Sequence, residues 1–327
     1  MREIEVETFL KPMGQGITRP ALVLGDDSEE YILKNQESNN NGSLVNYDCM
    51  FVNELLAFQI GDYLGIPMPE AVIAMLDKLL IETDPTIRFS YRFKEGKFFA
   101  TKNIKEVENN ILENYQQLKN MNKPYLSKSW KSFFNKIDNK DDIAKIIAFD
   151  ILIANFDRYS NEGNLLVSSE NGRKVYAIDH GHAFFGPTWN LDKINCLRIN
   201  NITMNYINFF VSLVIDTMRI SGQCSSGIIF SALQECINLE DVENHSFKDI
   251  VCKINSINEE MIIRWCNNIP DEWYVDKESQ IAHYSNFILK QKNIVHVIIQ
   301  VLAEQNAFSN YRGGELKYGS IKKENSI

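Results

Sequence analysis

Two polar clusters within residues 155–185 constrain this chain more than any other stretch. The first contains Asp157 and Asn164, the second contains Asp179, and two short apolar runs around a Ser-Ser-Glu-Asn-Gly turn separate them. An apolar run, a polar turn and a second apolar run predict a β-hairpin, which would bring the three side chains together at its ends. Carboxylates and a carboxamide oxygen suit magnesium, which usually shares phosphate oxygens with its substrate. The stretch therefore favours phosphoryl transfer.

The composition argues against several classes of protein. The chain has 327 residues, enough for one large domain or two lobes, and its formal net charge of −9 argues against direct binding to nucleic acid or an anionic membrane. The six cysteines show no CxxC pairing and the five histidines no HExxH arrangement, so we expect reduced thiols rather than a zinc site. We find no signal-peptide pattern and no apolar run long enough for a membrane helix, which predicts a cytoplasmic location.

The first strands predict a β-rich N-terminal region. Residues 3–10 and 21–36 alternate as strands do and predict a three-stranded meander, with Gly14, Gln15 and Gly16 in the turn between its first two strands. Backbone without side chains could let amide groups approach phosphate oxygens there. A simple hairpin turn would use glycine for the same backbone reasons, so this pattern alone leaves both interpretations open.

Lys34 lies at the end of the third predicted strand, where a side chain directed into a cleft could contact phosphates. The polar, asparagine-rich residues 35–48 predict a mobile loop. Residues 50–65 carry apolar side chains at helical spacing and end at a glycine, which predicts a helix. Glu54 in this helix either holds Lys34 in place or is a surface residue without a partner.

The pattern becomes helical in the second part of the chain. We expect a crossing to a second lobe between residues 92 and 110, followed by helices on both sides of the predicted hairpin. The sequence thus predicts an α+β fold with two lobes, a β-rich N-lobe over residues 1–100 and a mostly helical C-lobe over 101–308. Residues 309–327 predict a flexible tail.

The order of these parts resembles a protein-kinase-like fold, and four stretches resemble the HipA-like kinases in particular. They are GQGITRP (14–20), NELLAFQIGDYLGIPMPE (53–70), NFDRYSNEGNLL (155–166) and AIDHGHAF (177–184). The last stretch is also similar to the metal-binding stretch of phosphatidylinositol kinases. Any one string could arise by chance, whereas their joint order and spacing are specific.

The resemblance implies a kinase that uses ATP and Mg²⁺. Carried onto this sequence, it makes Asp157 the catalytic aspartate that orients the attacking hydroxyl or accepts its proton. It makes Lys34 the contact to the nucleotide phosphates and Glu54 its ion-pair partner. The glycine turn at residues 14–16 would cover the phosphates. In such sites catalysis is almost entirely positioning and charge stabilisation, which these residue types can supply.

The resemblance also implies two metal ligands, Asn164 and Asp179. Kinase catalytic loops usually have asparagine five residues after the aspartate, a position that Glu162 occupies here. The Leu-Leu pair that follows Asn164 mimics the strand entry after the ligand asparagine of related kinases and favours that residue, with Asn161 as its substitute.

His180 and His182 stand on either side of Gly181, directly after the second aspartate. Either histidine could contact phosphate, or hydrogen-bond the catalytic loop in a structural role. Ligation of the metal by histidine is the least expected role, because magnesium prefers oxygen.

The leading hypothesis is transfer of the γ-phosphate of ATP to a hydroxyl, with serine or threonine of a protein as the acceptor. A lipid or small-molecule kinase is one alternative, suggested by the similarity to phosphatidylinositol kinases. A nucleotide-binding pseudokinase that acts as a binding module is another, suggested by Glu162 and the short glycine turn. An antitoxin or repressor partner is expected by analogy only.

Overall fold

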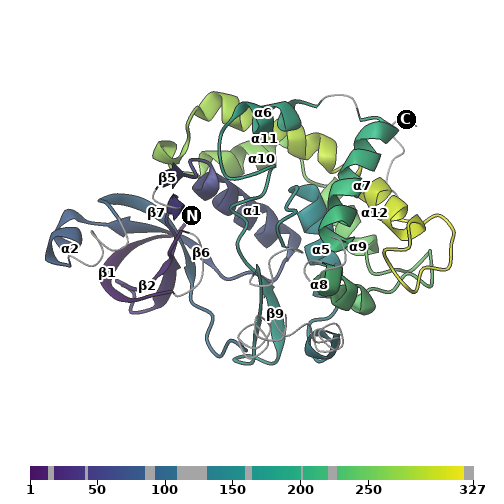
Figure 1. Ribbon diagram of the computed structural model, residues 1–327, viewed down its shortest axis with the longest axis horizontal. Coiled ribbons are helices and arrows are strands. Elements are labelled where there is room, and N and C mark those ends of the chain that lie inside the picture. The colour runs from purple at the N-terminus through teal and green to yellow at the C-terminus, as the bar shows by residue number, and fades with distance from the viewer. Residues whose placement is uncertain are drawn as a thin grey trace.

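Most strands gather on one side of the molecule and most helices on the other in the computed structural model (Figure 1). Helix α1 (Met50–Leu64) lies between them. The structure describes residues 1–13, 18–40, 43–84, 93–108, 131–158, 164–199, 202–219 and 227–319. One hydrophobic core fills the strand region, and a second, larger core includes α1 and the helices.

Five strands form a closed barrel in the order β1-β2-β3-β7-β6. They are β1 (Glu3–Pro12), β2 (Ala21–Gly25), β3 (Glu30–Leu33), β6 (Ala71–Leu76) and β7 (Gly96–Lys102). Neighbouring strands are antiparallel except β1 and β6, which pair in parallel. Alternate residues such as Ile4, Val6 and Val23 point into the barrel core, as the period of two requires. The predicted three-stranded meander is confirmed as β1, β2 and β3.

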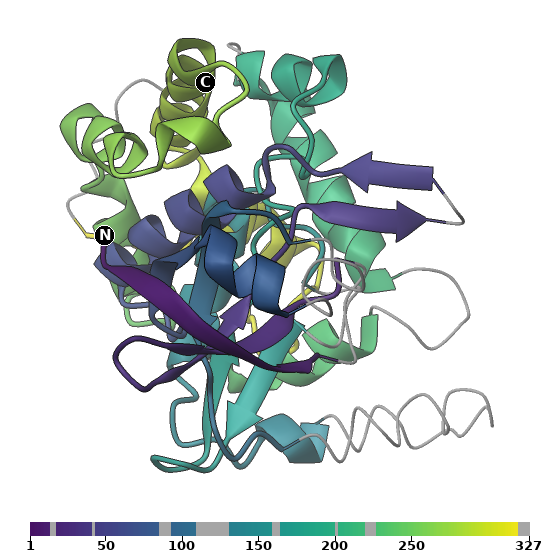
Figure 2. The same ribbon diagram turned by 90° about the vertical axis from the view of Figure 1, so that its left-hand side faces the viewer.

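A second, separate hairpin projects from the molecule between β3 and α1 (Figure 2). Its strands are β4 (Glu37–Asn40) and β5 (Ser43–Asn46), which pair antiparallel. The prediction of a mobile loop over residues 35–48 was therefore wrong. The polar composition hid a local signal, because Asn-Gly at residues 41 and 42 is the strongest two-residue indication of a hairpin.

Helix α1 is the central element of the fold. Most of its residues are buried, on every face rather than along one stripe. Phe51 packs between Phe98 of β7 and Trp273, so the helix joins the barrel to the helical region. The helix ends at Gly65, whose φ of 74° is the left-handed conformation that favours glycine. The predicted helix over residues 50–65 is confirmed.

The predicted hairpin after the first polar cluster is confirmed as β8 (Leu165–Ser168) and β9 (Lys174–Ala177). Helix α5 (Asp142–Leu152) precedes it and is buried along most of its length. After α5 the chain turns sharply, and Phe184 N donates to Ile153 O at 2.7 Å. This backbone bond joins the loop of the first polar cluster to the loop of the second.

The remaining helices form the outer part of the helical region (Figure 1). They are α6 (Leu191–Arg198), α7 (Met204–Arg219), α8 (Gly227–Leu233), α9 (Lys248–Asn255), α10 (Glu259–Asn267), α11 (Lys277–Gln291) and α12 (Val295–Glu304), with α2 (Lys78–Thr83) beside the barrel. None of the helices in the described ranges has the length and apolarity needed to span a membrane.

The segment after α12 packs back onto the helices. Leu316 and Tyr318 are buried, and the Tyr318 ring stacks edge-on against His245 and His296. Lys317 N donates to Val242 O at 2.8 Å. The part of the predicted tail up to residue 319 therefore contacts the helical region closely, and residues 320–327 lie outside the described ranges.

Candidate active site

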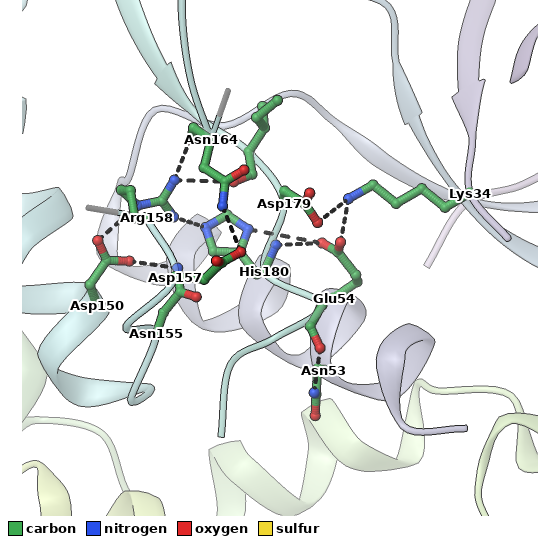
Figure 3. A network of polar contacts seen from close by, with 12 residues as sticks. Lys34, Asn53, Glu54, Asp150, Asn155, Asp157, Arg158, Asn164, Asp179 and His180 are labelled. Carbon is green, nitrogen blue, oxygen red and sulfur yellow. Dashed lines mark hydrogen bonds and ion pairs between the residues drawn. The ribbon is translucent and has the colours of Figure 1, made fainter. Parts of the chain in front are cut away.

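Lys34, Glu54 and Asp179 come from three separate segments of the chain and meet at one point (Figure 3). Lys34 directly follows β3, and its Nζ pairs with Glu54 Oε1 of α1 and with Asp179 Oδ1, the latter at 3.1 Å. The Lys34 and Glu54 side chains are largely buried, whereas the Asp179 side chain is 42% exposed. A ligand can therefore approach the Asp179 carboxylate from solvent.

Burial and pairing set the charges of these three groups. Burial acts to lower the pKa of Lys34, but the Asp179 and Glu54 carboxylates outweigh it and raise this pKa. Burial raises the pKa of Glu54 more than Lys34 lowers it. Burial would also raise the pKa of Asp179, but the Lys34 ammonium prevails and lowers it to about 2. Lys34 and Asp179 are thus both charged at neutral pH.

Asp157 and Asn164 form the second part of the site. Asn164 Nδ2 donates to Asp157 Oδ2 at 3.0 Å, just before β8 begins. Asn164 is buried. Because the amide nitrogen is engaged by Asp157, the carboxamide oxygen is the atom of Asn164 that could bind a cation.

Arg158 connects the two parts of the site from below the surface. Its side chain has no exposed area, and its Nε donates to Asp150 Oδ2 at 2.7 Å. Nη1 donates to the carbonyls of Asn164 and Ile178, the latter at 3.1 Å, and Nη2 contacts His180 Nε2 at 2.7 Å. One guanidinium therefore holds the loop before β8, the loop after β9 and the end of α5 together.

The contacts of His180 define its tautomer. A guanidinium only donates hydrogen bonds, so Nε2 accepts from Arg158 and Nδ1 carries the proton. Nδ1 lies 4.0 Å from Glu54 Oε2, and the His180 backbone N–H donates to the same oxygen at 3.1 Å. Burial, together with Arg158 and Lys34, lowers the pKa of His180 well below its usual value. His180 is thus a neutral link between the Arg158 network and the Lys34–Glu54 pair.

The backbone at Asp179 is unusual. Its φ of 60° is uncommon for a residue with a side chain, and such conformations persist only where the surroundings enforce them. Two residues on, Gly181 lies so close to α1 that a Cβ would stand 2.5 Å from Met50 Cγ. A glycine is therefore required at this close approach, which lies next to the contact with Glu54.

The structure brings Lys34, Glu54 and Asp179 into contact, and Asp157 into contact with Asn164. The remaining predicted site residues lie outside the described ranges; they are Gly14, Gln15, Gly16 and Asn161. His182 is exposed, with its ring 6.0 Å from that of Tyr47. In the part of the chain that the structure describes, no three His, Cys, Asp or Glu side chains cluster as a metal site.

Sequence reasoning missed three residues that organise the site. No supporting role was predicted for Arg158, Asn53 or Lys193. Asn53 had a signal, because a carboxamide in a mostly apolar helix must find hydrogen-bond partners where it is buried. Lys193 had a weaker signal. It stands in the first turn of α6, where a helix favours an acidic side chain over a basic one.

The sequence model of the HipA-like kinase family matches residues 6–196, more than half of the chain. The chain therefore belongs to the HipA-like kinase family. Its class of activity is phosphoryl transfer. No curated protein matches the chain.

Two solved structures resemble the chain at low identity. One is the crystal structure of a Helicobacter pylori proinflammatory kinase, CtkA, at 16% identity, covering 94% of this chain and 97% of that one with a TM-score of 0.45. The other is HipA of Shewanella oneidensis MR-1, from a toxin–antitoxin complex with HipB and its operator DNA. It matches at 12% identity, covering 87% of this chain and 62% of that one with a TM-score of 0.37.

Proposed function

We propose that this protein transfers the γ-phosphate of ATP to a hydroxyl group, and that the acceptor is a serine or threonine of a protein. The observation that carries the proposal is the contact of Lys34 with both Glu54 and Asp179. A lysine fixed by a helix glutamate and adjoining an exposed carboxylate is the arrangement that positions nucleotide phosphates beside a metal. ATP would bind between an N-lobe of residues 1–100 and a C-lobe of residues 101–308.

The residues of the chain divide the work of the reaction. Lys34 contacts the phosphates, and Glu54 keeps its ammonium in place. Asp157, whose Oδ2 accepts from Asn164, orients the attacking hydroxyl and accepts its proton. The turn at residues 14–16 covers the phosphates through its backbone. Arg158 keeps the loops that carry these groups at a fixed separation.

Asn164 and Asp179 would hold Mg²⁺. Their carboxamide and carboxylate oxygens are the hard donors that this ion prefers, and Asp179 is ionised and accessible. Two protein ligands are enough, because magnesium usually keeps several waters and binds substrate phosphates. Bound there, it would neutralise charge that develops on the phosphate oxygens. Asn161 stays the alternative to Asn164.

Transfer of labelled phosphate from ATP tests the proposal. The assay compares the wild type with Asp157→Ala and Asp179→Ala, with self-phosphorylation measured beside added protein acceptors. We expect each variant to lose roughly 10²–10⁴-fold in rate. Asp62→Ala, which changes an exposed aspartate of α1, is the matched control and should keep the wild-type rate. Equal incorporation in all four proteins would remove both aspartates from the mechanism.

Separate measurements test the chemical class of the acceptor and the presence of a protein partner. Transfer to phosphoinositide vesicles but not to protein would replace the protein acceptor by a lipid. Binding of ATP with Mg²⁺ in calorimetry without any transfer would instead make the protein a nucleotide-binding module. An antitoxin or repressor partner is proposed from the family analogy, and retention of a DNA-binding repressor protein during purification would support it.

A further inference from the structure

The segment that follows Asp179 is fastened to α1 by one carboxamide. Asn53, which is fully buried, places Nδ2 2.7 Å from Gly181 O and 3.0 Å from the carbonyls of both Ala183 and Gly186. Asn53 is the neighbour of Glu54, which binds Lys34 and the His180 backbone. The same helix therefore fixes the chain over residues 180–186, directly after Asp179.

A buried lysine completes this attachment. Lys193 of α6 donates from Nζ to Gly186 O at 2.6 Å and to Asn53 Oδ1 at 3.1 Å. The Tyr284 hydroxyl of α11 donates to the same Asn53 oxygen at 2.8 Å, and the Lys193 ammonium lies 5.3 Å from the centre of the Tyr284 ring. Helices α1, α6 and α11 thus meet on residues 181–186.

Lys193 occupies this place against two physical preferences. Its exposed fraction is 1%, and its ammonium donates hydrogen bonds to two neutral oxygens, those of Asn53 and Gly186. It also stands in the first turn of α6, where the helix dipole disfavours a cation. The groups that face it are the Cys49 thiol, the Asp48 carboxylate and the Tyr284 ring, and burial outweighs them to lower the pKa of Lys193 to about 8. A group kept at such a cost is expected to serve function.

We propose that Lys193 is a positioning residue of phosphoryl transfer, which holds residues 181–186 through Gly186 and Asn53 and so keeps Asp179 turned toward Lys34. The proposal rests on the proposed function. Its physical basis is the left-handed backbone of Asp179, which needs support from the surrounding chain. The direct contact of Lys193 with this loop supplies that support at Gly186, seven residues after Asp179.

Hydrogen exchange of the full chain tests this inference without reference to activity. In Lys193→Met, peptides covering residues 179–190 should exchange roughly tenfold faster than in the wild type, because the loop loses one of its attachments. Lys290→Met is the matched control. Lys290 also donates to backbone carbonyls, those of Leu197 and Ile199, but these lie beyond the loop. Exchange of residues 179–190 should be unchanged in this variant.

Kinetics provide the second readout. We expect Lys193→Met to lower kcat roughly tenfold and to raise the apparent KM for Mg²⁺, with the KM for the protein acceptor unchanged. Lys193→Gln, which keeps a donor without the charge, replaces the methionine variant if that one does not fold. Unchanged exchange in residues 179–190, or an equal rise in the Lys290→Met control, would overturn the inference. A wild type that transfers no phosphate would refute the proposed function alone, and the exchange data would still decide the role of Lys193.

Discussion

Replacement of Arg158 by methionine should destabilise the protein severely. The change removes the guanidinium but keeps a side chain of comparable length, so packing is largely retained. The Asp150 carboxylate, which is 2% exposed, would lose its charged partner at 2.7 Å. The carbonyls of Asn164 and Ile178 would also lose a donor. The consequence is an uncompensated charge and two weakened acceptors in the core of the site.

The structure allows the size of this effect to be worked out. Removing one partner of a buried ion pair costs about 3–5 kcal/mol. The Ile178 carbonyl, left without this donor, adds about 1 kcal/mol, whereas the Asn164 carbonyl keeps the Ile178 N–H at 3.2 Å. The sum is about 4–6 kcal/mol, which is comparable with the whole stability of many domains. Asp150→Asn in the same chain removes the unpaired charge and should restore about 2–3 kcal/mol.

Urea unfolding followed by tryptophan fluorescence measures both effects. Arg312→Met is the matched control, because Arg312 pairs with Glu240 at 3.1 Å where both side chains are exposed. This surface pair should contribute less than about 1 kcal/mol. A stability of Arg158→Met within about 1 kcal/mol of the wild type would refute this prediction, and so would a further loss of stability when Asp150→Asn is added.

Three further changes test other parts of the structure. Lys193 has a folded-state pKa of about 8, below its ordinary 10.5, so the unfolded chain binds more protons between these values and wild-type stability rises with pH there. From pH 7.5 to pH 10.5, the unfolding free energy should therefore rise by about 3 kcal/mol more in the wild type than in Lys193→Met. Parallel curves of unfolding free energy against pH for the two proteins would contradict this. Gly181→Ala should cost about 1–3 kcal/mol by contact with Met50, and Met50→Ala should relieve it in a denaturation series. Tyr318→Ala should release the C-terminal segment, and limited proteolysis that cuts this variant no faster than the wild type would show that Tyr318 does not hold it.

Local patterns were enough to predict the elements that carry the site. The period of two in β1 to β3, the apolar run of α1 and the two short runs of β8 and β9 each depend on neighbouring residues only. Lys34 and Glu54 could be paired in advance because the family resemblance implied the pair. The β4–β5 hairpin was missed because polar composition was weighed above the Asn-Gly pair in the sequence between the two strands.

The contacts that support the site depend on the three-dimensional fold. A charged residue after an aspartate is usually solvated, and only the return of β9 brings Ile178 and His180 to Arg158. Lys193 and Asn53 are 140 residues apart in sequence, so no local pattern could join them. The family resemblance therefore indicated which residues are expected to contact a substrate, whereas the residues that hold them became apparent only from contacts between distant segments of the chain.

Helix α1 has a consequence for how the chain tolerates variation. A helix on a protein surface accepts many substitutions along its solvent face, at every third or fourth position. Most positions of α1 are buried, Asn53 and Glu54 among them, and exposed Asp62 is an exception. In a library of all single substitutions, tolerance to substitution should be low at nearly every position of α1. It should not rise at every third or fourth position, as it does in a surface helix, and should resemble that of a strand in the protein core.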